Sequence, residues 1–185
     1  MARKQNTPND PERRERILDA TMTLLQDGGI AAVTARAVAG RANVPVGSVS
    51  YHFDSVRALL LEAAHRIIEL RDRSLEEWGE SVTRSTITDR LAELIHEQIT
   101  TGRNVTVVAY ELYLLGLRDE DFRALSVETT TVLSRQLAKH VGDAEAWRLA
   151  TVADGLQLHS LFLTEAPSPA SLTTALSRDL PSEGA

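Results

Sequence analysis

The sequence has no cysteine among its 185 residues, which excludes disulfides, thiol chemistry and cysteine-ligated zinc. It has no apolar run long enough to span a bilayer, and its N-terminus, MARKQNTPNDPERR, lacks the apolar core of a signal peptide. These absences predict a soluble, cytoplasmic protein with no membrane partner. A reducing compartment agrees with the lack of cysteine.

The common motifs of catalysis are also missing. The histidines, at positions 52, 65, 96, 140 and 159, are too scattered for a metal site of the HExxH type. Gly28 and Gly29 lack the preceding strand that a phosphate-binding loop needs, and no G-x-S-x-G motif occurs. We therefore predict that the protein is not an enzyme, with no catalytic residue, metal or cofactor.

Charge is distributed unevenly along the chain. The formal net charge is −6, yet residues 1–60 contain 8 basic against 6 acidic residues, and residues 61–185 contain 12 against 20. The N-terminal third is therefore mildly basic, as a nucleic-acid-binding head requires, although the excess is modest. Arg3 and Lys4 could form a flexible arm that reaches DNA, or part of a solvated tail.

Apolar residues make up 43% of the chain and recur at helical spacing almost throughout, which predicts an all-α fold with a small head and a larger body. The first helix should be capped by Asp10 and Pro11 and carry Arg13, Arg14 and Arg16 on its outer face. The predicted helices are 11–28, 34–42, 45–53, 56–80, a helix from Thr86 or Thr88 to about 99, 105–117, 120–141, 143–164 and a short last one over 171–179.

The stretch from Thr34 to Phe53 has the pattern of two short helices joined by a tight turn. Thr34 is a good helix cap, and Asn43 tolerates the left-handed conformation at a helix exit. Pro45 suits the first turn of the second helix, which should turn Val49 and Phe53 inward. The pattern alone fits either a helix-turn-helix that enters the DNA major groove or an ordinary helical hairpin.

Residues 29–60, GIAAVTARAVAGRANVPVGSVSYHFDSVRALL, resemble the N-terminal DNA-binding domain of the TetR family of bacterial transcriptional regulators. The motifs that carry the resemblance are Thr34-x-Arg36, the run from Val44 to Ser48, and Tyr51-His52-Phe53 followed by Ala-Leu-Leu at 58–60. The resemblance implies an N-terminal three-helix DNA-binding head over residues 1–55. It implies a larger helical body for ligand binding and dimerisation over residues 56–185.

The resemblance also implies roles for single residues. Phosphate contacts are expected from Thr34, Arg36, Tyr51 and His52, and the recognition helix should offer Val46, Gly47, Ser48 and Ser50 to base edges. Three positions depart from the family pattern: Pro45 replaces Ser or Thr, Ser50 replaces Tyr, and Val56 replaces a phosphate-binding Lys. The missing lysine should weaken DNA binding or shift phosphate contacts to Arg57 and the N-terminal arm.

The most apolar segment, residues 105–117, is expected to be a buried helix at the middle of the body. Its polar residues Tyr110, Glu111 and Tyr113 could orient a ligand or be satisfied internally. The candidate ligand-binding residues are His65, Leu94, Gln98, Val108, Glu111, Leu114 and His159. The small-molecule effector should be largely hydrophobic.

Of the last two long helices, 120–141 and 143–164, the second is apolar over much of its circumference and needs two partners, which predicts a homodimer through a four-helix interface formed by both helices of each copy. The predicted function is a ligand-responsive transcriptional repressor that binds a palindromic, double-stranded DNA operator as a homodimer. The alternative is a helical DNA-binding or protein-interaction module without a small-molecule ligand.

Overall fold

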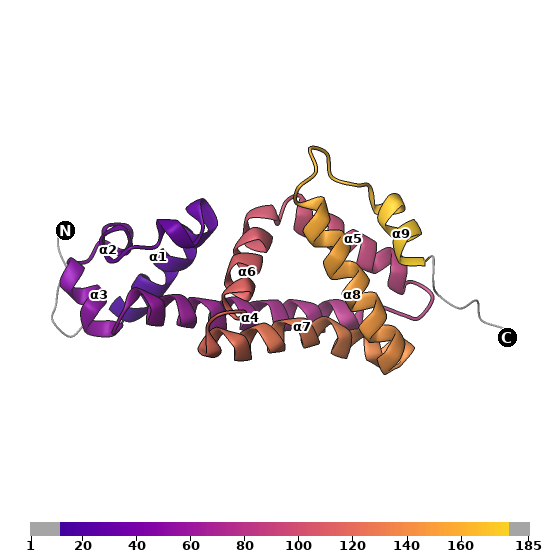
Figure 1. Ribbon diagram of the computed structural model, residues 1–185, viewed down its shortest axis with the longest axis horizontal. Coiled ribbons are helices and arrows are strands. Elements are labelled where there is room, and N and C mark those ends of the chain that lie inside the picture. The colour runs from indigo at the N-terminus through magenta and orange to yellow at the C-terminus, as the bar shows by residue number, and fades with distance from the viewer. Residues whose placement is uncertain (1–11, 178–185) are drawn as a thin grey trace. The chain divides into compact units, whose positions relative to one another are not determined.

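The computed structural model describes residues 12–177 of the chain, and it confirms the all-α fold (Figure 1). The elements are α1 Arg13–Gly28, the 3-10 helix η1 Ile30–Ala32, α2 Ala35–Ala42, α3 Val46–His52, α4 Val56–Glu80, α5 Ile87–Ile99, α6 Arg103–Leu115, α7 Glu120–Val141, α8 Asp143–Ser160 and α9 Pro169–Ser177. None of these helices is long and apolar enough to cross a membrane.

Internal contacts divide the described residues into two units. The first unit comprises residues 12–67 and 108–125, and the second comprises residues 68–107 and 126–177. The chain passes between them inside α4, inside α6 and inside α7. The functional boundary predicted after residue 55 is a separate matter and stays a prediction.

The core of the first unit is built from the inner faces of α1, α2 and α3 with the start of α4. Its fully or almost fully buried side chains include Ile17, Leu25, Val38, Ala39, Val49, Phe53 and Leu59. Each large aliphatic or aromatic side chain among them contributes roughly 1.5–3 kcal/mol by leaving water. This packing fixes the three short helices against one another.

The start of α1 corrects one prediction. Arg13 is buried, with 9% exposure, and does not lie on the outer face of the helix. It precedes the buried Ile17 by four residues, so both side chains lie on the same face of α1. The predicted cap residues Asp10 and Pro11 lie outside the described residues, and α1 begins at Arg13 after Glu12.

The second unit buries one face of α5 against α8 and α9. The buried side chains include Ile87, Leu91, Ile95, Ile99, Leu149, Ala153, Leu172 and Leu176. The last helix begins at Pro169, two residues earlier than predicted, because Ser168 caps it: the Ser168 hydroxyl accepts a hydrogen bond from the Ser171 N–H at 3.2 Å. The predicted end of this helix at Asp179 lies outside the described residues.

Helix α6 is less buried than predicted. It runs from Arg103 to Leu115, two residues earlier than the apolar run suggests, and Leu114 and Leu117 are 51% and 70% exposed. Only one side of its apolar segment is inside, where Val108 and Leu112 are almost fully buried at helical spacing. Helix α8 likewise ends at Ser160, four residues before the predicted end.

Candidate nucleic-acid interface

Helix α2 has the two terminal features that the sequence predicts. Thr34 is the N-cap in an extended conformation, and its hydroxyl accepts a hydrogen bond from the Ala37 N–H at 3.2 Å. At the other end Asn43 adopts the left-handed conformation, with φ 53° and ψ 50°, and the Val44 N–H donates to the Ala39 carbonyl at 3.0 Å. The turn between α2 and α3 is therefore fixed by local hydrogen bonds.

Helix α3 follows this turn at once. The sequence predicts Pro45 in the first turn of this helix. In the structure Pro45 is instead the N-cap, one residue before α3 begins, and its ψ of 144° is extended. Its carbonyl accepts from the Ser48 N–H at 2.8 Å, which starts the helix. Val49 and the following Phe53 are 3% and 5% exposed, as predicted, so packing fixes which face of α3 turns outward.

The outer face of α3 brings together the predicted base-reading and phosphate-contacting residues of this helix. Tyr51 is 82% exposed and Val46 48% exposed, while Gly47 and Ser50 are also exposed, and Ser48 and His52 are half-buried. A Cβ added at Gly47 would meet no atom of residues 12–177 within 4 Å, so none of these neighbours requires a glycine there. The rings of Tyr51 and His52 contact each other edge to face, with centroids 5.1 Å apart.

Arg36 differs from the other arginines of the first 60 residues that the structure describes. It is exposed on α2 and forms no hydrogen bond or ion pair with the described residues. Arg41 pairs with Asp27 at 3.0 Å, and Arg14 pairs with Glu62 at 2.5 Å and lies over the Phe53 ring at 4.9 Å. Arg13 and Arg16 also have contacts within the chain. Of the arginines compared in this described part of the chain, Arg36 is therefore the one best able to bind an anion.

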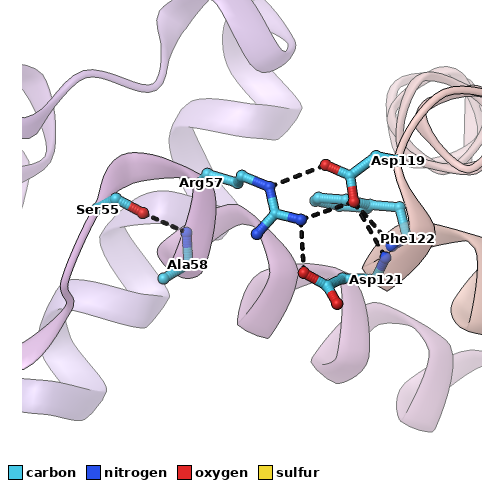
Figure 2. Close-up of polar contacts among 6 residues, drawn as sticks. All are labelled: Ser55, Arg57, Ala58, Asp119, Asp121 and Phe122. Atoms are coloured by element: carbon cyan, nitrogen blue, oxygen red, sulfur yellow. Dashed lines mark hydrogen bonds and ion pairs between the residues drawn. The ribbon is translucent and has the colours of Figure 1, made fainter.

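Arg57 is bound to other residues of the chain (Figure 2). The sequence suggests it as a residue that takes over the phosphate contact of the lysine missing at position 56. Its Nε and Nη2 donate to the two Asp119 oxygens at 2.8 and 2.7 Å, and Nη2 also donates to Asp121 at 2.5 Å. The hydrogen bond from Arg57 holds the pKa of Asp119 below its usual range, and the same hydrogen bond raises the pKa of Arg57. We refer to Arg57, Asp119 and Asp121 as the arginine clamp.

Glu111 lies in the first unit and contacts the link between α1 and α2. Its Oε2 accepts a hydrogen bond from the Ile30 N–H at 2.9 Å, at the start of η1. The preceding Gly29 has a positive φ of 68°, which favours glycine. No local pattern could have revealed this contact, because the two partners are 81 residues apart.

A small cavity in the second unit contains two of the predicted ligand-binding residues, Leu94 and Gln98. It is lined by Arg71, Leu75, Leu91, Leu94, Ile95, Gln98, Leu133, Ala153, Asp154 and Gln157. Its volume is about 10 Å³, room for about one water molecule. Gln157 Nε2 donates a hydrogen bond to Gln98 Oε1 at the cavity wall.

The other predicted ligand-binding residues do not line this cavity. His65, Leu114 and His159 are exposed, Val108 is buried, and Glu111 contacts Ile30. The cavity instead includes Arg71, whose Nε is buried without a hydrogen-bond partner among the described residues. Its position four residues before the buried Leu75 would have been the signal for it, since both side chains share one face of α4.

Two family sequence models match the chain. The one described as "Bacterial regulatory proteins, tetR family" matches residues 17–63, and the one described as "Tetracyclin repressor-like, C-terminal domain" matches residues 82–182.

Curated relatives include the HTH-type transcriptional repressor KstR of Rhodococcus jostii, 51% identical over 61 residues, which are 33% of this chain and 29% of that protein. The same repressor of Mycobacterium tuberculosis is 53% identical over 55 residues, 30% of this chain and 25% of that protein. The matched residues therefore span less than a third of these relatives.

Solved structures match over almost the whole chain. A transcriptional regulator from Streptomyces coelicolor superposes with a TM-score of 0.80 at 35% identity, covering 91% of this chain and 98% of the other. The multidrug binding protein EbrR complexed with ethidium superposes with a TM-score of 0.79 at 30% identity, covering 92% and 99%.

Proposed function

Because the chain belongs to the TetR family of bacterial regulatory proteins, we propose that it is a transcriptional repressor that binds a palindromic operator as a homodimer and is released by a small molecule. The observation that carries the proposal is the outward face of α3, which follows the Asn43 turn and presents small, polar and aromatic side chains to solvent. The likeness to the KstR repressors supports repression as the regulatory sign.

Sequence readout is assigned to the first two turns of α3. Val46 can contact a thymine methyl group, and the absent side chain of Gly47 lets the backbone approach the base edges. The hydroxyl groups of Ser48 and Ser50 can donate to or accept from either base of a pair. This set has no arginine or glutamine for bidentate base contacts, so single-base discrimination should be moderate.

Phosphate binding is assigned to residues at the edges of the helix pair. Arg36 is exposed and unpaired within residues 12–177, so no ion pair has to break before it reaches a phosphate. Thr34, Tyr51 and His52 add hydrogen-bond donors that position the helix without reading sequence. The loss of the usual lysine, at Val56, gives these donors a larger share of the affinity.

The effector is proposed to enter the second unit at the cavity beside Leu94 and Gln98. A cavity of about 10 Å³ cannot hold an organic molecule, so the ligand must stabilise a body conformation with a larger cavity than this one. Its walls are mainly aliphatic, with Arg71 and Asp154 as charged groups of opposite sign. The ethidium complex of EbrR supports a small-molecule response in this family.

The dimer interface is proposed on the outer faces of α7 and α8. Trp147 and Phe162 are 68% and 83% exposed, and the exposed Thr151 and Gly155 lie between them on one face of α8 and the turn that follows. On α7 the exposed side chains include Val127 at 59%. Large apolar side chains left in solvent next to small residues suit the close packing of helices from a second copy.

The experiment that tests the function is selection of the purified protein against random duplex DNA at two salt concentrations, with sequencing of the retained DNA. We expect an enriched palindrome with half-sites about one helical turn apart and weaker retention at the higher salt. Arg36→Gln should lose affinity for all sequences and reduce the salt slope, whereas Arg73→Gln, an exposed arginine of the second unit, should change neither. If no DNA sequence is enriched at either salt concentration, the proposal that the protein is a DNA-binding regulator is rejected.

A second candidate is a DNA-binding regulator without a small-molecule effector, which the small size of the cavity favours. Screening compounds for release of the selected operator separates the two. Release by a compound whose effect disappears in Gln98→Leu supports the ligand-responsive repressor. Failure of every compound in a chemically diverse set to release the operator would favour the second candidate.

A further inference from the structure

Two acidic side chains from residues 108–125 hold the helix-turn-helix from outside its own sequence. Glu111 of α6 binds the chain just before α2, and Asp119 ahead of α7 binds the first turn of α4, just after α3. All four partners belong to the first unit. The helix pair is therefore held at both of its ends.

At the entry, the contact fixes the backbone itself. Glu111 accepts from the Ile30 N–H, and the left-handed Gly29 brings the backbone so close to this carboxylate that an added Cβ would lie 2.8 Å from both of its oxygens. Ile30 precedes the α2 cap Thr34 by four residues. A shift of Glu111 would therefore move the backbone at Ile30, four residues before the cap of α2.

At the exit, the arginine clamp has a directional geometry. Two parallel N–H donors of Arg57 engage both oxygens of Asp119, which restricts rotation as well as distance. Asp119 also accepts from the Asp121 N–H at 3.1 Å, so its carboxylate is fixed to the first turn of α7 (Figure 2). Arg57 itself lies just after Ser55, whose hydroxyl caps α4 by accepting from the Ala58 N–H at 3.0 Å.

We infer that Glu111 and Asp119 are positioning residues for DNA binding: they brace the two ends of the helix-turn-helix, so that residues 108–125 form one operator-reading unit with residues 12–67. The inference rests on the proposed function. The family sequence model for the DNA-binding domain matches only residues 17–63, and neither acid lies in it. Helices α6 and α7 both continue from residues 108–125 into the second unit, so the brace connects the helix-turn-helix to that unit through the chain itself.

The direction in which DNA affinity changes when an acid is neutralised distinguishes a brace from simple electrostatic repulsion. Removing a negative charge near DNA should strengthen binding to phosphates. Asp119→Asn breaks the paired geometry with Arg57, and we expect it to weaken binding to the selected operator by about fivefold, the equivalent of one net hydrogen bond. The matched control is Glu120→Gln, which removes the neighbouring charge of an exposed residue that does not contact Arg57. It should leave binding unchanged or strengthen it slightly.

The entry contact is tested with a pair of variants at one position. Glu111→Ala removes the acceptor of the Ile30 N–H and should weaken operator binding by about fivefold. It should also speed hydrogen exchange of the Ile30 amide in the full-length protein. Glu111→Gln keeps an acceptor without the charge, so it should retain most of the operator affinity and most of the protection of the Ile30 amide from exchange. Because these are surface or half-buried sites, far-ultraviolet circular dichroism should show folded protein in every case.

Three outcomes would overturn the brace. They are Asp119→Asn behaving like Glu120→Gln, Glu111→Ala binding the operator as well as the wild type, and Glu111→Gln failing as badly as Glu111→Ala. The wild-type protein is measured alongside, on random and on selected DNA. If the wild type itself binds no DNA, the proposed function fails; if it binds and the variants behave as in any of these three outcomes, only the brace fails.

Discussion

Replacing Gly29 by alanine tests whether the link between α1 and α2 is as constrained as its geometry indicates. Gly29 has φ 68° and ψ −168°, a region that is almost restricted to glycine, so an alanine there costs of order 1–3 kcal/mol. The new Cβ would lie 2.8 Å from both Glu111 oxygens. If Glu111 withdraws, the hydrogen bond from Ile30 is lost, at about 1 kcal/mol.

Together these effects predict a loss of about 2–4 kcal/mol in the free energy of unfolding, a large part of the roughly 5–15 kcal/mol typical of a folded domain. Urea unfolding followed by circular dichroism would measure it. The control is Gly40→Ala on the exposed face of α2, where a Cβ meets no atom of the described residues within 4 Å. Alanine should stabilise that helix by about 0.5–1 kcal/mol, the opposite sign.

A double variant separates the two causes. In the Glu111→Ala background the carboxylate is gone, so Gly29→Ala should cost only the backbone term there. Equal costs of Gly29→Ala in both backgrounds would refute the steric role of Glu111. A Gly29→Ala protein within about 0.5 kcal/mol of the wild type, a difference typical of neutral surface substitutions, would refute the whole reasoning.

Three further predictions concern other parts of the chain. Gly155→Leu adds a side chain in a space that residues 12–177 of one chain leave open, so light scattering should show a monomer if α8 faces a second copy. Gly40→Leu should keep the mass of a dimer, and a dimer for both variants would reject this interface. Burial raises the pKa of Asp72, so the folded state loses stability as the pH rises through that pKa; Asp72→Asn should raise the melting temperature at neutral pH, and the gain should vanish below the ordinary value of 3.8. In the DNA selection, Ser48→Ala should change the preference at one base position, whereas Tyr51→Ala should weaken all sequences alike; the reverse pattern would exchange their roles.

The features that sequence reasoning found are those with local causes. The bounds of α4 and α7 agree with the predicted ranges, because their apolar spacing continues over many turns and their ends carry local stop signals such as Gly142. The left-handed Asn43 and the capping Thr34 are likewise decided by their own side chains. The two short helices and the turn between them were therefore predictable from about twenty residues of sequence, whereas their interpretation as a DNA-binding helix-turn-helix needed the family resemblance over residues 29–60.

The features that it missed depend on residues distant in the chain or on the phase of a helix. Glu111 and Arg57 find partners 81 and 62 residues away, and no local spacing encodes such pairs. The prediction that Arg13 lies on the outer face was wrong for a different reason. It rested on the charge of arginine, whereas the four-residue spacing to the buried Ile17 places Arg13 on the inner face of α1. For α6, hydrophobicity overstated burial, because an apolar residue on one face of a helix can remain exposed.

The contacts of the arginines bear on how an acidic chain could bind DNA. Several cations of the first unit are already bound inside the chain: Arg14 to Glu62, Arg41 to Asp27 and Arg57 to the clamp aspartates. Bound in this way they contribute little positive potential, so nonspecific attraction of the single head must be weak. A useful operator affinity then requires two heads on one DNA and good contacts at the α3 face. This is the physical reason why the proposed DNA binding and the proposed dimer depend on each other.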